Sequence, residues 1–144
     1  MKRVEQLQDL SRENHASLVM AKKIAEVARQ GTEAELLEAI ETVKDYYEKE
    51  LEVHFQHEER TIFAPIYKDY QDHIALATGL LKEHGFMRML VPALKIETAR
   101  KDLAEFAEVL KNHTRVEERE LFPLVESLFS EAQLDAVFNF VPLD

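Results

Sequence analysis

Residues 51–63, LEVHFQHEERTIF, return in altered form as residues 110–122, LKNHTRVEERELF. In both stretches a leucine precedes a histidine by three residues, and a glutamate follows that histidine by four. Both then continue through Glu-Glu-Arg and end in phenylalanine. A four-residue step turns only about 40° around an α-helix, so each histidine and its glutamate point in nearly the same direction.

Each stretch continues an apolar stripe of helical spacing. The first stripe consists of the apolar residues Leu36, Ile40, Val43, Tyr47 and Leu51. It continues at the same spacing through His54, Glu58 and Ile62. The second stripe comprises Leu103, Phe106 and Leu110, then His113, Glu117, Leu121 and Leu124. A bundle helix turns such a stripe toward the core, so both copies are predicted to place a histidine and a glutamate inside the protein.

The apolar periodicity, together with the glycines, prolines and capping residues between periodic stretches, predicts four long helices. They span about 4–30, 32–63, 72–94 and 98–120 or beyond. Gly31 suits a left-handed cap after the first helix, and Thr32 with Glu35 forms a capping box for the second. Pro65 is expected to stop the second helix, and Ser130 with Gln133 to cap a short fifth one. These elements predict an all-α, up-down-up-down four-helix bundle in one domain, residues 1–144.

Composition excludes several classes of function. The chain has 144 residues, a formal net charge of −10 and no cysteine. A surplus of negative charge without a basic cluster argues against nucleic acid and against an anionic membrane surface. The absence of cysteine excludes disulfides and thiolate ligands. The polar N-terminus lacks the apolar centre of a signal peptide, so we expect a cytoplasmic protein.

The other two helices each add an inward histidine, His15 within ENHASL and His84 within KEHGFM. A buried carboxylate must be protonated, paired or bound to metal, and neither histidine-bearing stripe offers a lysine or arginine there. A single core histidine is usually structural, but this set favours a metal site. Imidazole and carboxylate suit iron, manganese or zinc, and facing carboxylates suit two ions. The predicted ligands are His15, His54, Glu58, His84, His113 and Glu117.

In these same segments the chain resembles the hemerythrin-like, or HHE cation-binding, family. The resemblance covers ENHASL, HFQHEERTIF, KEHGFM and HTRVEERELFPLVESLFSEAQL, which together extend over almost the whole length. It implies a non-haem centre of two iron ions inside a four-helix bundle. Carried over to this chain, the four histidines would be terminal ligands and Glu58 and Glu117 would bridge the ions.

The chain departs from the oxygen-carrying members of that family at two points. They have a second histidine one turn from the one on the third helix, where this chain has Leu80 and Arg88. They also use an aspartate five residues after the last histidine, where this chain has Glu118. We favour Glu117 because it matches Glu58 in the repeat. The missing histidine argues against simple oxygen carriage and leaves a position open for a small ligand.

Three further residues receive secondary expectations. His57 lies off the stripe and is expected on the flank of the site, and His73 is too far along its helix to share a metal with His84. Tyr47 is expected to pack in the core, and the alternative for it is a hydrogen-bond donor near the site. We also expect like charge to raise the pKa of the two glutamates in the metal-free protein, so that replacing them with glutamine would stabilise it.

The leading functional hypothesis is a di-iron protein that binds or senses dioxygen, nitric oxide or iron. An oxidoreductase acting on dioxygen, peroxide or nitric oxide is the alternative, although the sequence identifies no base, nucleophile or substrate pocket. Iron–sulfur cluster repair is a weaker third, because related proteins in that role commonly carry an additional cysteine-bearing domain. A metal-free structural bundle is the remaining possibility.

Overall fold

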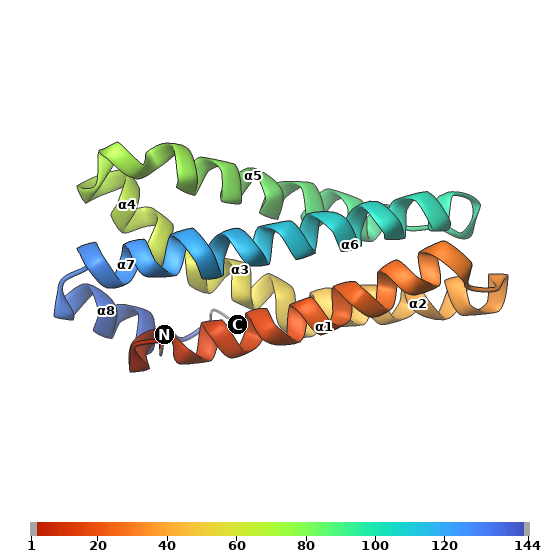
Figure 1. Cartoon of the computed structure of the whole chain (residues 1–144), viewed down its shortest axis with the longest axis horizontal. Helices are drawn as coiled ribbons and strands as arrows, with labels where there is room; N and C mark the ends of the chain where they lie inside the picture. Colours follow the sequence, from red (N-terminus) through yellow and green to blue (C-terminus); the bar gives the residue numbers. More distant parts are fainter. Residues whose placement is uncertain (1–2, 143–144) are drawn as a thin grey trace.

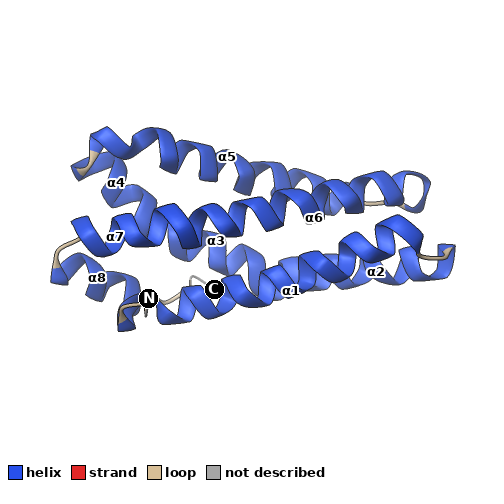
Figure 2. Cartoon of the chain, viewed as in Figure 1, coloured by secondary structure: helices blue, strands red, loops and turns tan. Residues whose placement is uncertain are grey.

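The computed structural model describes residues 3–142, and all regular structure in that range is helical (Figure 2). Four long helical segments lie along the longest axis of the molecule, and a short helix, α8 (Glu131–Phe138), lies at one end of them (Figure 1). The first segment is α1 (Gln8–Gln30), preceded by a 3-10 turn, Glu5–Leu7. The predicted four-helix bundle with a short C-terminal helix is confirmed.

The second and fourth segments are continuous composites of α- and π-helix. The second comprises α2 (Glu33–Tyr46), a π segment (Tyr47–Leu51), α3 (Glu52–Glu58), a π segment (Glu59–Phe63) and α4 (Ala64–Asp69). The fourth comprises α6 (Ala99–Val116), a π segment (Glu117–Leu121) and α7 (Phe122–Leu128). Because π turns are rare and concentrate at functional sites, the segments that begin at Glu59 and Glu117 mark the repeated stretches as unusual.

The third segment is simpler. It consists of α5 (Ile74–Leu90) with 3-10 turns at its two ends, Gln71–His73 and Val91–Ala93. A further 3-10 turn, Ile96–Thr98, leads into α6. Pro92 therefore ends the α-helical part of this segment, as its missing N–H and fixed φ require.

Two details of the predicted boundaries are wrong. Pro65 does not stop the second segment, because it lies in the first turn of α4, directly after a π segment, where a residue without an N–H is tolerated. Gly31 is not a left-handed cap, since its φ is −72°. Its lack of a side chain serves close packing instead, because a Cβ there would lie 2.6 Å from the carbonyl oxygen of Val27.

Both predicted capping boxes are confirmed. The Thr32 side chain accepts from the backbone N–H of Glu35 at 3.2 Å, and the Glu35 carboxylate accepts from the N–H of Thr32 at 2.8 Å. Ser130 and Gln133 make the same reciprocal pair at the start of α8, at 3.1 and 3.0 Å. Each box satisfies two backbone donors that a helix start would otherwise leave free.

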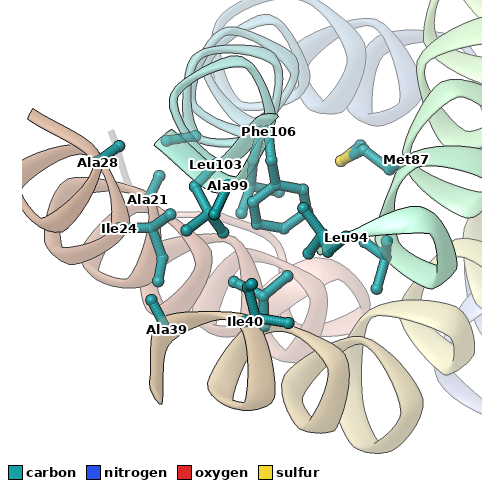
Figure 3. Close-up of a cluster of buried hydrophobic side chains, with 14 of the residues drawn as sticks. Ala21, Ile24, Ala28, Ala39, Ile40, Met87, Leu94, Ala99, Leu103 and Phe106 are labelled. Carbon is teal, nitrogen blue, oxygen red and sulfur yellow. The ribbon is translucent and has the colours of Figure 1, made fainter. Parts of the chain in front are cut away.

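The apolar interior is divided into two clusters. Figure 3 shows part of the first, in which alanines and isoleucines of α1 and α2 meet Leu103 and Phe106 of α6. The second lies toward α4, α7 and α8 and includes Ile62, Leu80 and Leu121. Along their segments, Glu58, His84, His113 and Glu117 fall between residues of the first cluster and residues of the second. None of the helices in the described range is long and apolar enough to cross a membrane.

Candidate metal centre

Five of the six predicted ligands come together in the interior. His54 and Glu58 lie on α3, His84 on α5, His113 on α6 and Glu117 at the start of the π segment that follows it. Both glutamates are fully buried, and His54 is the most exposed of the five at only 5 %. A polar cluster of this kind in a bundle core requires partners for its charges.

The two carboxylates lie between the three imidazoles. Glu58 has Oε2 3.4 Å from Nε2 of His54 and Oε1 3.2 Å from Nε2 of His84. Glu117 has Oε1 3.7 Å from Nε2 of His54 and Oε2 2.9 Å from Nε2 of His113. Each glutamate therefore presents one oxygen to His54 and its other oxygen to His84 or His113.

These facing atoms make no hydrogen bonds, although they are within ion-pair distance. Among the described residues, seven buried side-chain nitrogen and oxygen atoms lack a hydrogen-bond partner, and all seven belong to the cluster. They are the Nε2 atoms of the three histidines and the four oxygens of the two glutamates. A buried unpartnered polar atom costs about 1–3 kcal/mol, and a domain is stable by only roughly 5–15 kcal/mol, so ion-pair attraction alone is a poor account of the arrangement.

The donor set fits metal ions. One donor atom from each of Glu58, His84, His113 and Glu117 lies within 4.8 Å of the other three, and Nε2 of His54 extends this group on one side. Imidazole nitrogen with carboxylate oxygen is a combination that suits iron, manganese and zinc. Because the unpartnered atoms face one another, cations between them would satisfy all seven.

A carboxylate stands behind each of the three imidazoles. Nδ1 of His54 is 2.6 Å from Glu13, Nδ1 of His84 is 2.8 Å from Glu59, and Nδ1 of His113 is 2.8 Å from Glu83. A carboxylate accepts, so each Nδ1 carries the hydrogen, and in the neutral ring the lone pair is on Nε2, which faces the cluster. This arrangement orients metal-binding histidines and increases their basicity.

The sequence reasoning missed these three glutamates. In the sequence, each of them is next to a buried polar residue. Glu13 precedes Asn14, Glu59 follows Glu58, and Glu83 precedes His84. A neighbour of an inward residue is rotated by about 100° around the helix and so points toward the adjacent helix. That position is where a carboxylate can reach the back of an imidazole on another element.

The glutamate behind His84 belongs to a larger network. Arg88 donates to Glu59 at 2.7 and 3.1 Å and to Glu52 at 2.8 and 2.9 Å, and the Tyr47 hydroxyl donates to Glu52 at 2.6 Å. The guanidinium lowers the pKa of Glu52 to about 2. Tyr47 is half-buried, and its hydroxyl is linked to His84 through Glu52, Arg88 and Glu59. These contacts correspond to the alternative expectation, a hydrogen-bond donor near the site, rather than to core packing alone.

In the metal-free protein, protonated histidines of the cluster pair with ionised carboxylates. Burial by itself would lower the pKa of His113, but the nearby charge of Glu117 and the hydrogen bond to Glu83 raise it to about 10. The same opposition raises the pKa of His54 and of His84. Burial would raise the pKa of Glu117, but the adjacent imidazoles hold it well below its usual value. The expected rise is therefore wrong for Glu117, since attraction to histidine exceeds burial and repulsion between carboxylates.

His15 is the predicted ligand that the structure does not bring to the cluster. Its side chain is exposed on α1, and the inward face of that helix is instead occupied by Asn14 and Ser17. The buried stripe of α1 comprises Leu10, Asn14, Ser17, Ala21, Ile24 and Ala28, a regular alternation of three- and four-residue steps. His15 is one residue off this stripe, about 100° around the helix, so the prediction that it points into the core is wrong.

The remaining polar residues near the repeats lie outside the cluster. His57 is half-buried, with Nε2 2.6 Å from the carbonyl oxygen of Val137 and its ring stacked on Phe140 at 4.5 Å. Glu118 accepts from Ser11 at 2.8 Å and from Asn14 at 3.0 Å. These contacts agree with the placement of His57 on the flank and with the choice of Glu117 over Glu118.

Comparison with known protein families gives one match. The sequence model described as the Hemerythrin HHE cation binding domain matches residues 6–125, which include all five residues of the cluster and His15. Searches of curated proteins and of solved structures give no significant match. The family model thus covers most of the chain and agrees with the helical fold and the buried donor set.

Proposed function

The chain belongs to the hemerythrin HHE cation-binding domain family, and from the geometry of its buried cluster we propose that it holds a non-haem centre of two iron ions. The protein would use that centre to bind or sense a small ligand such as dioxygen or nitric oxide. The observation that carries the proposal is the set of seven unpartnered donor atoms that face one another in the core. A single domain, residues 1–144, would house the centre.

The distances divide the donors into two groups. His84 and His113, with Oε1 of Glu58 and Oε2 of Glu117, would hold one ion. His54, with the other oxygen of each glutamate, would hold the second. Glu58 and Glu117 would then bridge the two ions, and their negative charges would offset the repulsion between them.

The two groups differ in the number of protein ligands. The first has two imidazoles and two carboxylate oxygens, and the second has a single imidazole and two carboxylate oxygens. His15 cannot complete the second group in the observed arrangement, because its side chain is exposed on α1. An ion at His54 would therefore have the larger number of positions left for solvent or an exogenous ligand.

When bound, a pair of iron ions supplies reversible redox chemistry and open coordination sites for small molecules. The residues of the chain provide the setting. Glu13, Glu59 and Glu83 fix the tautomer of the three imidazoles, and Phe55 stacks on His84 at 4.0 Å and excludes water from that ring. Glu58 and Glu117 would supply the negative charge that offsets the repulsion between the two ions. Fixed imidazoles and an aromatic ring that excludes water suit the binding of a small ligand at a metal centre protected from solvent.

Metal analysis with a visible spectrum tests the proposal directly. Protein purified aerobically from an iron-replete source should contain about two iron ions per chain and should show charge-transfer absorption that azide or nitric oxide changes. Glu58→Ala should lose most of the iron, because it removes a ligand from both ions. A wild-type protein that takes up no iron after anaerobic incubation with ferrous iron would overturn the proposal.

A further inference from the structure

A pocket of about 320 Å³ opens between α1 and the second helical segment and ends on one residue of the cluster. One wall is formed by Glu13, Ala16 and Ser17 of α1, and the other by Tyr46, Glu50 and Leu51. At its end lies His54, which is nine-tenths buried and whose Nε2 has no hydrogen-bond partner. The pocket thus connects the surface with the ring of His54, whose Nδ1 side faces Glu13 in the lining and whose Nε2 side faces the cluster.

The walls change from exposed to buried toward His54. Glu13, Ala16 and Glu50 are exposed and form the mouth, whereas Ser17 and Leu51, which line the pocket together with His54, are buried. Two of the residues that α1 contributes to the pocket, Ala16 and Ser17, have small side chains. Larger side chains at these positions would fill the pocket. His15, beside Ala16, is exposed and is not one of the residues that line the pocket.

One hydrogen bond spans the pocket from wall to wall. The hydroxyl of Tyr46 is 2.8 Å from Oγ of Ser17, and it joins the second helical segment to α1. A single neutral hydrogen bond contributes only about 1 kcal/mol, so thermal motion breaks it often. It is strong enough to hold the two walls at their observed separation and weak enough to let them move apart.

The mouth carries charge of one sign. Glu13 and Glu50 supply two carboxylates, and none of the described residues that line the pocket is a lysine or an arginine. Such a mouth attracts hydrated divalent cations and raises their local concentration. Glu13 also reaches inward, because it accepts from Nδ1 of His54 at 2.6 Å. A cation at the mouth is therefore one residue away from the first ligand of the centre.

We propose that this pocket is the passage through which divalent cations enter and leave the cluster, and that the Tyr46–Ser17 hydrogen bond is its latch. The inference rests on the proposed metal centre and adds the route by which the centre is loaded. Glu13 and Glu50 collect the cation, the small side chains of α1 give it space, and His54 receives it. Residues that line the passage without binding the metal affect how fast cations enter and leave, and they leave the affinity of the centre unchanged.

A passage has a kinetic signature that a ligand residue lacks. Narrowing it slows entrance and exit by the same factor, because both directions cross the same barrier. The equilibrium affinity then stays constant, whereas loss of a ligand changes affinity through the exit rate. The two rates together therefore distinguish an effect on the passage from an effect on the centre.

Ala16→Leu provides the narrowing variant. Ala16 is exposed on a helix, so leucine is compatible with folding, and its longer side chain extends over the mouth. Stopped-flow loading of metal-free protein with Co²⁺, and removal of Co²⁺ by excess chelator, give the two rates. Both should fall several-fold with an unchanged dissociation constant. Ala104→Leu is the matched control, because Ala104 is also exposed and lines a different groove between α1 and α6, and its rates should equal those of wild type.

Tyr46→Phe tests the latch. It keeps the ring and removes the hydroxyl, so both rates should rise together. Unchanged rates in Ala16→Leu, or equal slowing in Ala104→Leu, would overturn the assignment of this pocket even though the protein binds Co²⁺ normally. A protein that binds no Co²⁺ would instead overturn the metal centre itself, so the two failures are distinguishable.

Discussion

His54 and His57 lie one turn apart on α3 but have different surroundings. The imidazole of His54 faces Glu58 and Glu117, whereas that of His57 contacts Val137 and Phe140 near the C-terminus. His54→Ala should reduce the iron content from two ions per chain toward one. His57→Ala should keep both ions and lower the free energy of unfolding by about 1 kcal/mol.

Metal analysis and denaturant unfolding of the two variants check this pair of outcomes. The variants serve as controls for each other, since both remove an imidazole from the same helix. If His57→Ala lost the iron and His54→Ala kept it, the assignment of the cluster-facing side of α3 would be wrong by one turn.

Glu117 provides a second prediction for a single residue. Its Oε2 lies 2.9 Å from Nε2 of His113, and the pKa directions of the two groups describe a buried ion pair in the metal-free protein. Glu117→Gln should therefore lower the stability of the metal-free protein at pH 6, by about 1–3 kcal/mol. Thermal unfolding after exhaustive chelation measures it. A higher melting temperature than wild type would show that repulsion from Glu58 exceeds attraction to His113.

Helical spacing explains both the success and the failure of the sequence in locating the ligands. His54, Glu58, His113 and Glu117 continue stripes of large apolar residues, so their direction could be predicted. The stripe of α1 passes through Asn14, Ser17 and Ala21, which are polar or small and do not stand out. His15 is adjacent to this stripe and carries the chemistry expected of a ligand, so residue type favoured it and periodicity was the better guide.

Among elements, the link between α3 and α5 depends on Arg88. Its guanidinium joins Glu52 at the start of α3 to Glu59 just beyond its end. Arg88→Met should reduce the free energy of unfolding by about 2 kcal/mol, because two carboxylates lose a partly buried bidentate partner. Arg88→Lys keeps the charge without the planar fork and should recover only part of this.

Urea unfolding measures the loss. Arg60→Met is the matched control, since Arg60 is exposed on the neighbouring turn and has no side-chain hydrogen bond to a described residue. Equal stability of the Arg88→Met and Arg60→Met variants would show that solvent screens the Arg88 network to the level of an ordinary surface ion pair.

The short helix α8 depends on its capping box. Ser130 and Gln133 satisfy each other's backbone donors, and an eight-residue helix has too few internal bonds to be stable without such support. Ser130→Ala should cost about 1 kcal/mol in unfolding experiments. Ser127→Ala, at an exposed position within α7, should be nearly neutral. A neutral Ser130→Ala would mean that packing of α8 against the bundle holds it without the cap.

The extent of the helices was less predictable than their number. Thr32 and Ser130 have local partners three residues away, so their caps were visible in the sequence. Pro65 was expected to end a helix, but its effect depends on the π segment before it, which places it in a first turn. The sequence alone does not reveal that segment, because no side-chain cap marks the π turn at Glu59–Phe63.

The whole molecule places a charged cluster between two apolar clusters, so its stability should depend on both metal and pH. In the metal-free protein the pKa of His113 is raised to about 10 from an ordinary value of 6.5. A raised pKa in the folded state gives stability that is complete below the unfolded-state pKa and is lost as pH rises through the folded-state value. The melting temperature of the metal-free protein should therefore fall between about pH 6.5 and pH 10.

Metal should remove most of that decline. The histidines bind metal as neutral imidazoles, so loading releases protons. The loaded centre therefore has few protons left to lose as the pH rises. Binding to the folded state alone adds about 3–4 kcal/mol at 100 to 1,000 times the dissociation constant. The difference in melting temperature between loaded and metal-free protein should thus widen from pH 6 to pH 9, and a pH-sensitive dye should report proton release at pH 7. Parallel melting curves for the two forms across this range would show that the histidines are already neutral in the metal-free protein, and the buried ion pairs would then make no contribution to its stability.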